Sequence, residues 1–316
     1  MKRLVITGSS GYLGQTFVAH LRRHCNIEIL GIDIEPPGTS AALLDRFVPM
    51  DILSSKLSDL LDEVRPDTIV HAAFVLAPLR DQQKMRRIDV DGCRNLLAAS
   101  ATCGVERLMI VSSATAYGAW RDNPVPMDES QPLRMSAFQY ASDKVEMEGL
   151  ADEYADQHPN VAVSRVRPAI IGGAAMDNYL YRFIFNQAPI ILLDGFDTPV
   201  QFVHEDDVAA AMLAILAADS HGPFNVGPPD WCLVSEIAAE TQRRTVRRPF
   251  HLMRFVHWLA WATRRPGLEV PAEFLDFARY PWVVAPRRLE QELGFKFRHS
   301  SRETLLEIIR SRRPVK

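Results

Sequence analysis

The stretch VITGSSGYLGQTF, residues 5–17, places three glycines between two apolar segments. The preceding run RLVIT predicts a buried strand, and residues 12–23 carry apolar side chains at helical spacing. Gly8, Gly11 and Gly14 therefore lie on a strand-to-helix turn. Glycine costs roughly 0.5–1 kcal/mol relative to alanine in regular structure, so such a cluster indicates that something approaches the backbone closely. A pyrophosphate fits this turn, because a helix N-terminus offers unpaired N–H groups and a positive dipole end.

A carboxylate follows at the distance that a dinucleotide site requires. The next strand, IEILGID, ends at Asp33, about 20 residues beyond the glycines, where such a site binds the adenosine ribose hydroxyls. No arginine follows Asp33, and a 2′-phosphate would place a second anion beside this carboxylate. The sequence therefore predicts an NAD site and disfavours NADP.

The composition is that of an ordinary globular protein. The 316 residues are 47% hydrophobic with a net charge of −3, which gives no overall field for attracting nucleic acid. The chain enters a strand within three residues, so we expect no signal peptide. The four cysteines show no CxxC or His-paired spacing, so we expect no metal site, reduced thiols and a cytoplasmic protein.

Apolar runs alternate with helical patterns as far as about residue 170, which predicts a doubly wound parallel sheet of the Rossmann type in the α/β class. We expect residues 1–170 to form the NAD-binding domain, with helices at 82–101 and 137–157. Residues 171–316 are expected to form mainly a smaller substrate-binding lobe, with some segments returning to the first domain. The further strands expected are residues 47–52, 68–73, 107–113 and 161–170, and the shorter helices are 205–218, 235–243, 251–264 and 300–312.

The segment QYASDK places Tyr140 and Lys144 four residues apart, on one face of a predicted helix. A phenol with a pKa near 10 is a poor base at neutral pH, but a nearby ammonium and the positive nicotinamide of oxidised NAD favour the phenolate. Ser113 ends the preceding strand, where its hydroxyl could hydrogen-bond a substrate oxygen. The three side chains together predict general acid–base catalysis.

The motifs TGSSGYLG, HAA, SSATAYG and YASDK, with Asp33 and Asp51, resemble those of the extended short-chain dehydrogenase/reductase family, in its nucleotide-sugar epimerase and dehydratase group. The resemblance continues in FVHEDDVAAAMLAIL, FNVGPPD and RRLEQELGFKF, so it covers nearly the whole chain. These motifs are specific for the fold and much less specific for the substrate.

The resemblance implies that Tyr140 is the base, that Lys144 lowers the pKa of Tyr140 and holds the nicotinamide ribose, and that Ser113 polarises the reacting carbinol. It implies that the glycines bind pyrophosphate, that Asp33 binds the adenosine ribose, and that Asp51 and Ile52 flank the adenine. The remaining residues that it implies at the cofactor are Tyr12, Leu13, His71, Ala72, Ala73 and Pro168.

The chain departs from the family pattern around the substrate. Ala114 and Thr115 replace the two acidic residues that eliminate water in sugar dehydratases, so dehydration is disfavoured. Asp89 and Ala169 each replace a frequent asparagine near the active site.

A further departure lies just before the FVHEDD motif. Many sugar-nucleotide enzymes carry an arginine there for the substrate diphosphate, whereas this chain has Val200 and Gln201. A diphosphate without that guanidinium loses a charge-assisted partner, which weakens the assignment of a sugar-nucleotide substrate.

Three functional interpretations stay open. The leading one is a sugar 4-epimerase-type reaction, in which NAD(H) stays bound through the cycle and is retained on purification. Its rival is a simple NAD-dependent dehydrogenase or reductase of a more apolar alcohol or ketone. The third is a non-catalytic NAD-sensing protein, against which the presence of Ser113, Tyr140 and Lys144 argues. The family typically pairs two helices per subunit, so we expect a homodimer through residues 82–101 and 137–157.

The segment HLMRFVHWLAWAT, residues 251–263, is apolar almost all round and is flanked by arginines. It is too short to span a bilayer. An interfacial membrane helix has this pattern, and so does a helix that lines an apolar substrate pocket. The sequence favours the substrate-lobe helix, and contact with a membrane is not expected.

Overall fold

A computed structural model describes residues 1–186, 189–265 and 270–311. Its central sheet has the strand order β11-β6-β5-β4-β1-β2-β3, and every pair of neighbours runs parallel. The strands of this sheet are β1 (Arg3–Thr7), β2 (Glu28–Asp33), β3 (Arg46–Pro49), β4 (Thr68–His71), β5 (Arg107–Val111), β6 (Ala162–Pro168) and β11 (Gly222–Val226). The strand order reverses between β1 and β4, so the predicted doubly wound Rossmann sheet is confirmed.

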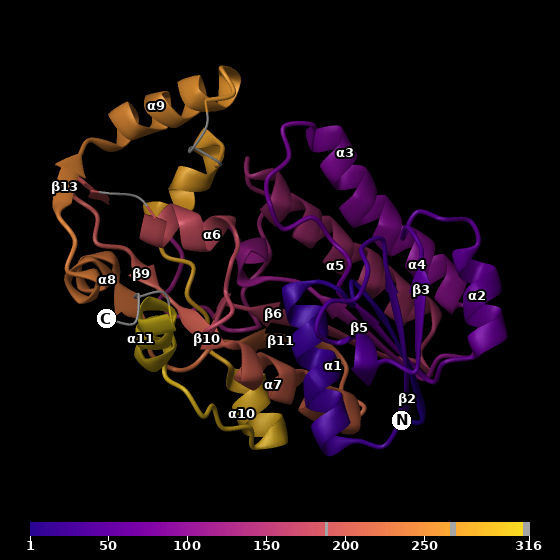
Figure 1. Cartoon of the computed structure of the whole chain (residues 1–316). Coiled ribbons are helices and arrows are strands. Elements are labelled where there is room, and N and C mark those ends of the chain that lie inside the picture. Colours follow the sequence, from indigo (N-terminus) through magenta and orange to yellow (C-terminus); the bar gives the residue numbers. More distant parts are fainter. Residues whose placement is uncertain (187–188, 266–269, 312–316) are drawn as a thin grey trace.

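Helices cover both faces of the sheet (Figure 1). Leu4 and Ile6 of β1 pack with the helices of one face, and Val5 packs with those of the other, as the alternation of a strand requires. The helices of the first face are α1 (Tyr12–His24) and α7 (Glu205–Ala217), and those of the second are α2 (Leu57–Val64), α4 (Gly92–Ser100) and α5 (Gln139–Gln157).

Two expected elements are divided in the structure. The helix expected at 82–101 consists of α3 (Gln82–Arg86), a π-helical turn (Arg87–Asp91) and α4. The strand expected at 161–170 ends at Pro168, and β7 (Ile170–Gly172) pairs instead with β10 (Phe202–His204). Strand β11 is an element that the sequence did not predict as a strand, because its five residues GPFNV show no clear alternation.

Most of the described residues after Gly172 form a smaller lobe beside one end of the sheet, whereas α7 and β11 return to the sheet (Figure 1). An aromatic core joins this lobe to Phe138 and Tyr140 of the first part, through Phe274, Phe277 and Trp282. Within the described residues no helix is long and apolar enough to cross a bilayer. The remaining elements are η1 (Ala41–Leu43), η3 (Ala114–Tyr117), α6 (Tyr179–Tyr181), the π-helical turn η4 (Arg182–Asn186), β8 (Ile190–Leu193), β9 (Pro199–Val200), β12 (Cys232–Leu233), α8 (Val234–Thr241), β13 (Thr245–Arg248), α9 (Phe250–Ala262), η5 (Ala272–Ala278), α10 (Arg287–Leu293) and α11 (Ser301–Ser311).

Candidate active site

The glycine turn lies against the end of β4. Gly8 has φ +75°, and a Cβ there would lie 2.4 Å from the Ala72 carbonyl oxygen. A Cβ on Gly14 would lie 2.1 Å from the Gly8 carbonyl oxygen. Both positions therefore require glycine. The N-cap residue of α1 is Gly11, which has no side chain that could cap the helix. The backbone N–H groups at the helix N-terminus therefore stay available to an anionic ligand.

A cleft beside this turn contains the residues expected around adenosine. The Asp33 carboxylate is fixed at the end of β2, where its Oδ2 accepts a hydrogen bond from the Ser10 N–H at 2.9 Å and its Oδ1 accepts one from the Glu35 N–H at 3.1 Å. The predicted residues that line this cleft are Gly8, Gly11, Asp33, Asp51, Ile52, Ala72 and Ala73. The glycine cradle, the open helix end and the carboxylate together fit NAD.

A second cleft, on the other side of the turn, contains the predicted catalytic hydroxyls. Ser113 and Tyr140 both line it, and the Ser113 hydroxyl acts on the phenol by lowering the pKa of Tyr140. Ser113 Oγ also accepts a hydrogen bond from the Thr115 N–H at 3.2 Å and lies 2.9 Å from Thr115 Oγ1. The predicted cofactor residues that line this cleft are Gly8, Gly11, Tyr12, Leu13, Gly14, Ala72 and Pro168.

The electrostatics of Tyr140 differ from the expectation. Burial, and after it the Asp89 carboxylate, raise the pKa of Tyr140, while the hydrogen bond with Ser113 lowers it. The Lys144 ammonium does not lie at the phenol oxygen. It donates to the Val111 carbonyl oxygen at 2.9 Å and lies 3.2 Å from the centre of the Phe74 ring. The expected lowering of the pKa of Tyr140 is therefore not present in this arrangement.

Lys144 belongs to a buried charged cluster below the cleft. Burial lowers the pKa of Lys144 to about 8, and the Asp89 carboxylate opposes this shift. Burial raises the pKa of Asp89 itself to about 7. Asp89 Oδ1 accepts a hydrogen bond from the Val75 N–H at 2.7 Å, whereas Oδ2 has no hydrogen-bond partner among the described residues. Asp89 lies on the π-helical turn between α3 and α4, a type of distortion frequent at functional sites.

Two predicted site residues lie outside both clefts. Lys144 is fully buried behind Phe74 and lines neither cleft. His71 is fully buried as well, with Nδ1 2.8 Å from Thr7 Oγ1, and burial lowers its pKa to about 3. For His71 the structure differs from the expectation, because the end of β4 directs Ala72 and Ala73, but not the imidazole, to the clefts.

Three residues of the site were missed by the sequence interpretation. Phe74 lines both clefts and covers Lys144, and Thr115 contacts Ser113. Glu148, a residue of α5, holds this helix against β6 through a buried ion pair with Arg167. Of the three, only Glu148 could have been found from the sequence, because it lies one helical turn after Lys144 on the same face of α5.

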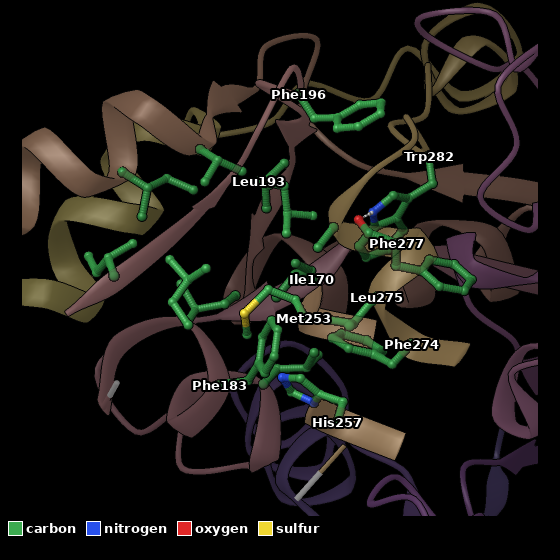
Figure 2. A pocket seen from close by; sticks show the side chains of 18 residues that line it. Ile170, Phe183, Leu193, Phe196, Met253, His257, Phe274, Leu275, Phe277 and Trp282 are labelled. Carbon is green, nitrogen blue, oxygen red and sulfur yellow. Dashed lines mark hydrogen bonds between the residues drawn. The ribbon is translucent and has the colours of Figure 1, made fainter. Parts of the chain in front are cut away.

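A large apolar cavity lies in the lobe (Figure 2) and shares wall residues with the second cleft. Its empty space is about 1010 Å³, open solvent at its mouth included. Ile170, Leu180, Phe274 and Trp282 form walls of both spaces. The further walls are Phe183, Ile184, Ile190, Ile191, Leu193, Phe196, Val200, Val234, Ile237, Met253, His257, Leu275, Phe277 and Ala278. Among the described residues that line the cleft and the cavity, none is lysine or arginine.

Val200 and Gln201, in the place of the missing arginine, have defined structural roles. Val200 is a wall of the apolar cavity. Gln201 is buried and joins two loops, because its amide donates to the carbonyl oxygens of Pro228 at 2.6 Å and Val284 at 2.9 Å and accepts from the Val284 N–H at 2.9 Å. Gln201 is therefore occupied and leaves no free donor for a diphosphate.

Comparison with known proteins points to the same family that the sequence motifs predicted. The family model "NAD dependent epimerase/dehydratase family" matches residues 4–227. An uncharacterised protein of Mycobacterium tuberculosis is 26% identical over 98% of this chain and 84% of its own length. UDP-glucose 4-epimerase of Mycolicibacterium smegmatis is 29% identical over 71% of this chain and 77% of its own length. The crystal structure of Thermus thermophilus UDP-glucose 4-epimerase with NAD superposes with a TM-score of 0.76 at 19% identity, covering 99% of this chain and 100% of that one.

This chain belongs to the NAD-dependent epimerase/dehydratase family. The family that the motifs predicted is therefore confirmed, and so is NAD as the cofactor of the family. The match at this level defines a class of enzyme and does not identify a reaction or a substrate.

Proposed function

We propose that this protein catalyses reversible hydride transfer between NAD and a secondary carbinol of an apolar substrate. The observation that carries the proposal is the apolar cavity, which shares four wall residues with the cleft of Ser113 and Tyr140. A diphosphate placed in this cavity would lose its hydration without gaining a cationic partner, which is unfavourable. An alcohol with a large apolar body would instead bury that body against aliphatic and aromatic side chains.

Each catalytic side chain has a role in this scheme. Bound NAD would supply the hydride acceptor. The Tyr140 oxygen takes the carbinol proton, and the Ser113 hydroxyl donates to the carbinol oxygen and keeps it beside Tyr140. Thr115 orients Ser113 through its N–H and hydroxyl. For Lys144 to reach a cofactor ribose, the Phe74 ring has to leave the ammonium that it now covers.

A sugar 4-epimerase-type reaction is the second candidate. It is favoured by the similarity to the epimerase of M. smegmatis over 71% of the chain, and both reactions use the same three catalytic residues. Dehydration remains disfavoured, since Ala114 and Thr115 offer no acid or base. The homodimer through residues 82–101 and 137–157 and the cytoplasmic location remain predictions.

The test compares two kinds of substrate on the purified protein. NADH formation is measured with NAD and secondary alcohols of increasing apolar size, and interconversion of UDP-glucose and UDP-galactose is measured in parallel. We expect oxidation whose KM falls as the apolar body grows, together with cofactor that exchanges freely. Interconversion of the sugar nucleotides by protein that retains its NAD(H), without alcohol oxidation, would instead establish the epimerase.

A wall residue supplies a matched variant. Phe183 lines the apolar cavity but not the catalytic cleft, and its ring lies 5.1 Å from that of Phe274. Phe183→Ala should raise the KM of a bulky apolar alcohol about tenfold, because it removes buried contact area. The KM of a short secondary alcohol and the affinity for NAD should not change in the same variant.

A further inference from the structure

Helix α9 carries apolar side chains on two opposite faces. The inner face packs into the lobe through Phe250, Met253, His257 and Ala260, of which Met253 and His257 are also walls of the apolar cavity. The outer face is exposed, with exposed fractions of 47% for Leu252, 56% for Phe255, 36% for Val256, 56% for Trp258 and 45% for Leu259. We call these five residues the outer face of α9.

The outer face is a continuous stripe. Leu252, Phe255, Val256 and Leu259 have the i, i+3, i+4, i+7 spacing that usually faces a core, and the Phe255 and Trp258 rings stack with centres 5.9 Å apart. Single exposed apolar residues are normal on a protein surface, but a contiguous group marks an interaction site. In Figure 1 the helix lies at the outer edge of the lobe, away from the sheet.

Positive charge surrounds this stripe. Residues 243–265 contain seven arginines and no aspartate or glutamate, although the whole chain has a net charge of −3. Arg247 and Arg248 precede the helix on β13, and Arg264 and Arg265 follow it, all four exposed. An apolar stripe between exposed arginines is complementary to a surface whose outer layer is anionic and whose interior is apolar.

The exposure of the outer face argues against the sequence-based expectation of no membrane contact, and we propose that α9 docks this protein on the surface of an anionic phospholipid bilayer. The outer face would enter the headgroup boundary, Trp258 would lie at the interface that tryptophan prefers, and the flanking arginines would contact lipid phosphates. The helix has 13 residues, which suits a helix that lies in the interface and does not cross it.

Docking would also place the apolar cavity next to lipid. Met253 and His257 form part of the cavity wall from the inner face of the helix that touches the membrane. An apolar alcohol dissolved in the bilayer would then have a short path to the cavity. This extension rests on the proposed function, whereas docking itself does not.

Vesicle sedimentation with the full chain tests the docking. We expect the protein to pellet with vesicles of phosphatidylcholine and phosphatidylglycerol, to pellet far less with phosphatidylcholine alone, and to be released by salt. The double variant Phe255→Ser, Leu259→Ser should bind at least about tenfold more weakly, because each side chain contributes buried apolar area in the membrane. The tryptophan fluorescence of the chain should shift to shorter wavelength on binding, and the shift should be smaller in Trp258→Phe.

The control replaces an exposed apolar residue elsewhere. Met135 is 53% exposed and lies outside α9, so Met135→Ser should bind vesicles like the parent protein. Unchanged affinity for NAD in all variants shows that they are folded. Because sedimentation requires no turnover, its result is independent of the substrate proposed above.

Three results would overturn the proposal. The parent protein could fail to pellet with anionic vesicles, or the double variant could bind them as well as the parent does. In the third, the parent protein self-associates in the absence of lipid and the double variant does not. This result would assign the outer face to contact with a second copy of this chain.

Discussion

The Arg167 guanidinium on β6 and the Glu148 carboxylate on α5 form a buried ion pair, with N–O distances of 2.6, 2.9 and 3.1 Å. Glu148 Oε1 also accepts a hydrogen bond from Ser112 Oγ at 2.5 Å, next to Ser113, which we propose as a catalytic residue. Arg167 continues the network by donating to the Tyr117 hydroxyl at 2.7 Å. The ion pair therefore links the helix of Tyr140 to the strand end of Ser113.

Glu148→Gln should reduce the free energy of unfolding by about 3–5 kcal/mol, because it leaves a buried guanidinium without its counter-charge. Chemical denaturation measures this loss. The double variant Glu148→Gln, Arg167→Met removes both charges and should lose less than the single variant. A larger loss in the double variant would show that packing of Arg167, and not its charge, stabilises this region.

Tyr140→Phe should lower turnover by about 10²–10⁴-fold, the usual loss of a general acid–base, because it removes the oxygen that takes the proton. Cofactor affinity should barely change, since the ring and its contacts stay. Steady-state kinetics and calorimetric titration with NAD measure the two effects. A near-normal rate in this variant would exclude Tyr140 as the base.

NAD should bind more tightly than NADP, because the Asp33 carboxylate would repel a 2′-phosphate. Asp33→Asn should reduce the ratio of the affinities for NAD and NADP by about tenfold, since it removes the charge but keeps an acceptor oxygen for the Ser10 N–H. Titration with both nucleotides checks this. Glu35, which also lines the adenosine cleft, supplies the control. Glu35→Gln should reduce the ratio of the NAD and NADP affinities less than Asp33→Asn does. Equal affinities in the parent protein would contradict the assignment.

The pH dependence of oxidation should move when Asp89 is neutralised. Oxidation rises with pH as the Tyr140 phenol loses its proton, and the Asp89 carboxylate raises the pKa of that phenol. Because Asp89 has a pKa of about 7, it is ionised above neutral pH. Asp89→Asn should therefore shift the ascending limb of the kcat profile to lower pH, by about one unit.

Asp143→Asn is the matched control for this effect. The Asp143 carboxylate is also part of the buried cluster and raises the pKa of Lys144, but it is not among the groups that shift Tyr140. Its substitution should leave the ascending limb in place. An equal shift in both variants would show that Asp89 acts through Lys144.

The sequence was most informative where structure is local. Gly8 and Asp33 were predicted from spacing, and Ser113 and Tyr140 from spacing together with the family resemblance. The structure places Gly8 and Asp33 in one cleft and Ser113 and Tyr140 in the next. It was less informative for Lys144, whose spacing from Tyr140 is as expected but whose ammonium is directed to the Val111 carbonyl oxygen by strand β5.

The amino-acid sequence by itself determined the doubly wound sheet and indicated NAD as the cofactor, and it predicted Ser113 and Tyr140 as the catalytic hydroxyls. These depend on the periodicity of strands and helices and on backbone turns, which are set by neighbouring residues. Only the tertiary structure decided the character of the substrate cavity, the pKa of Tyr140 and the exposure of the outer face of α9. Burial and side-chain direction depend on contacts between segments as distant as Ile170, Met253 and Trp282, and no local pattern encodes which of these segments meet.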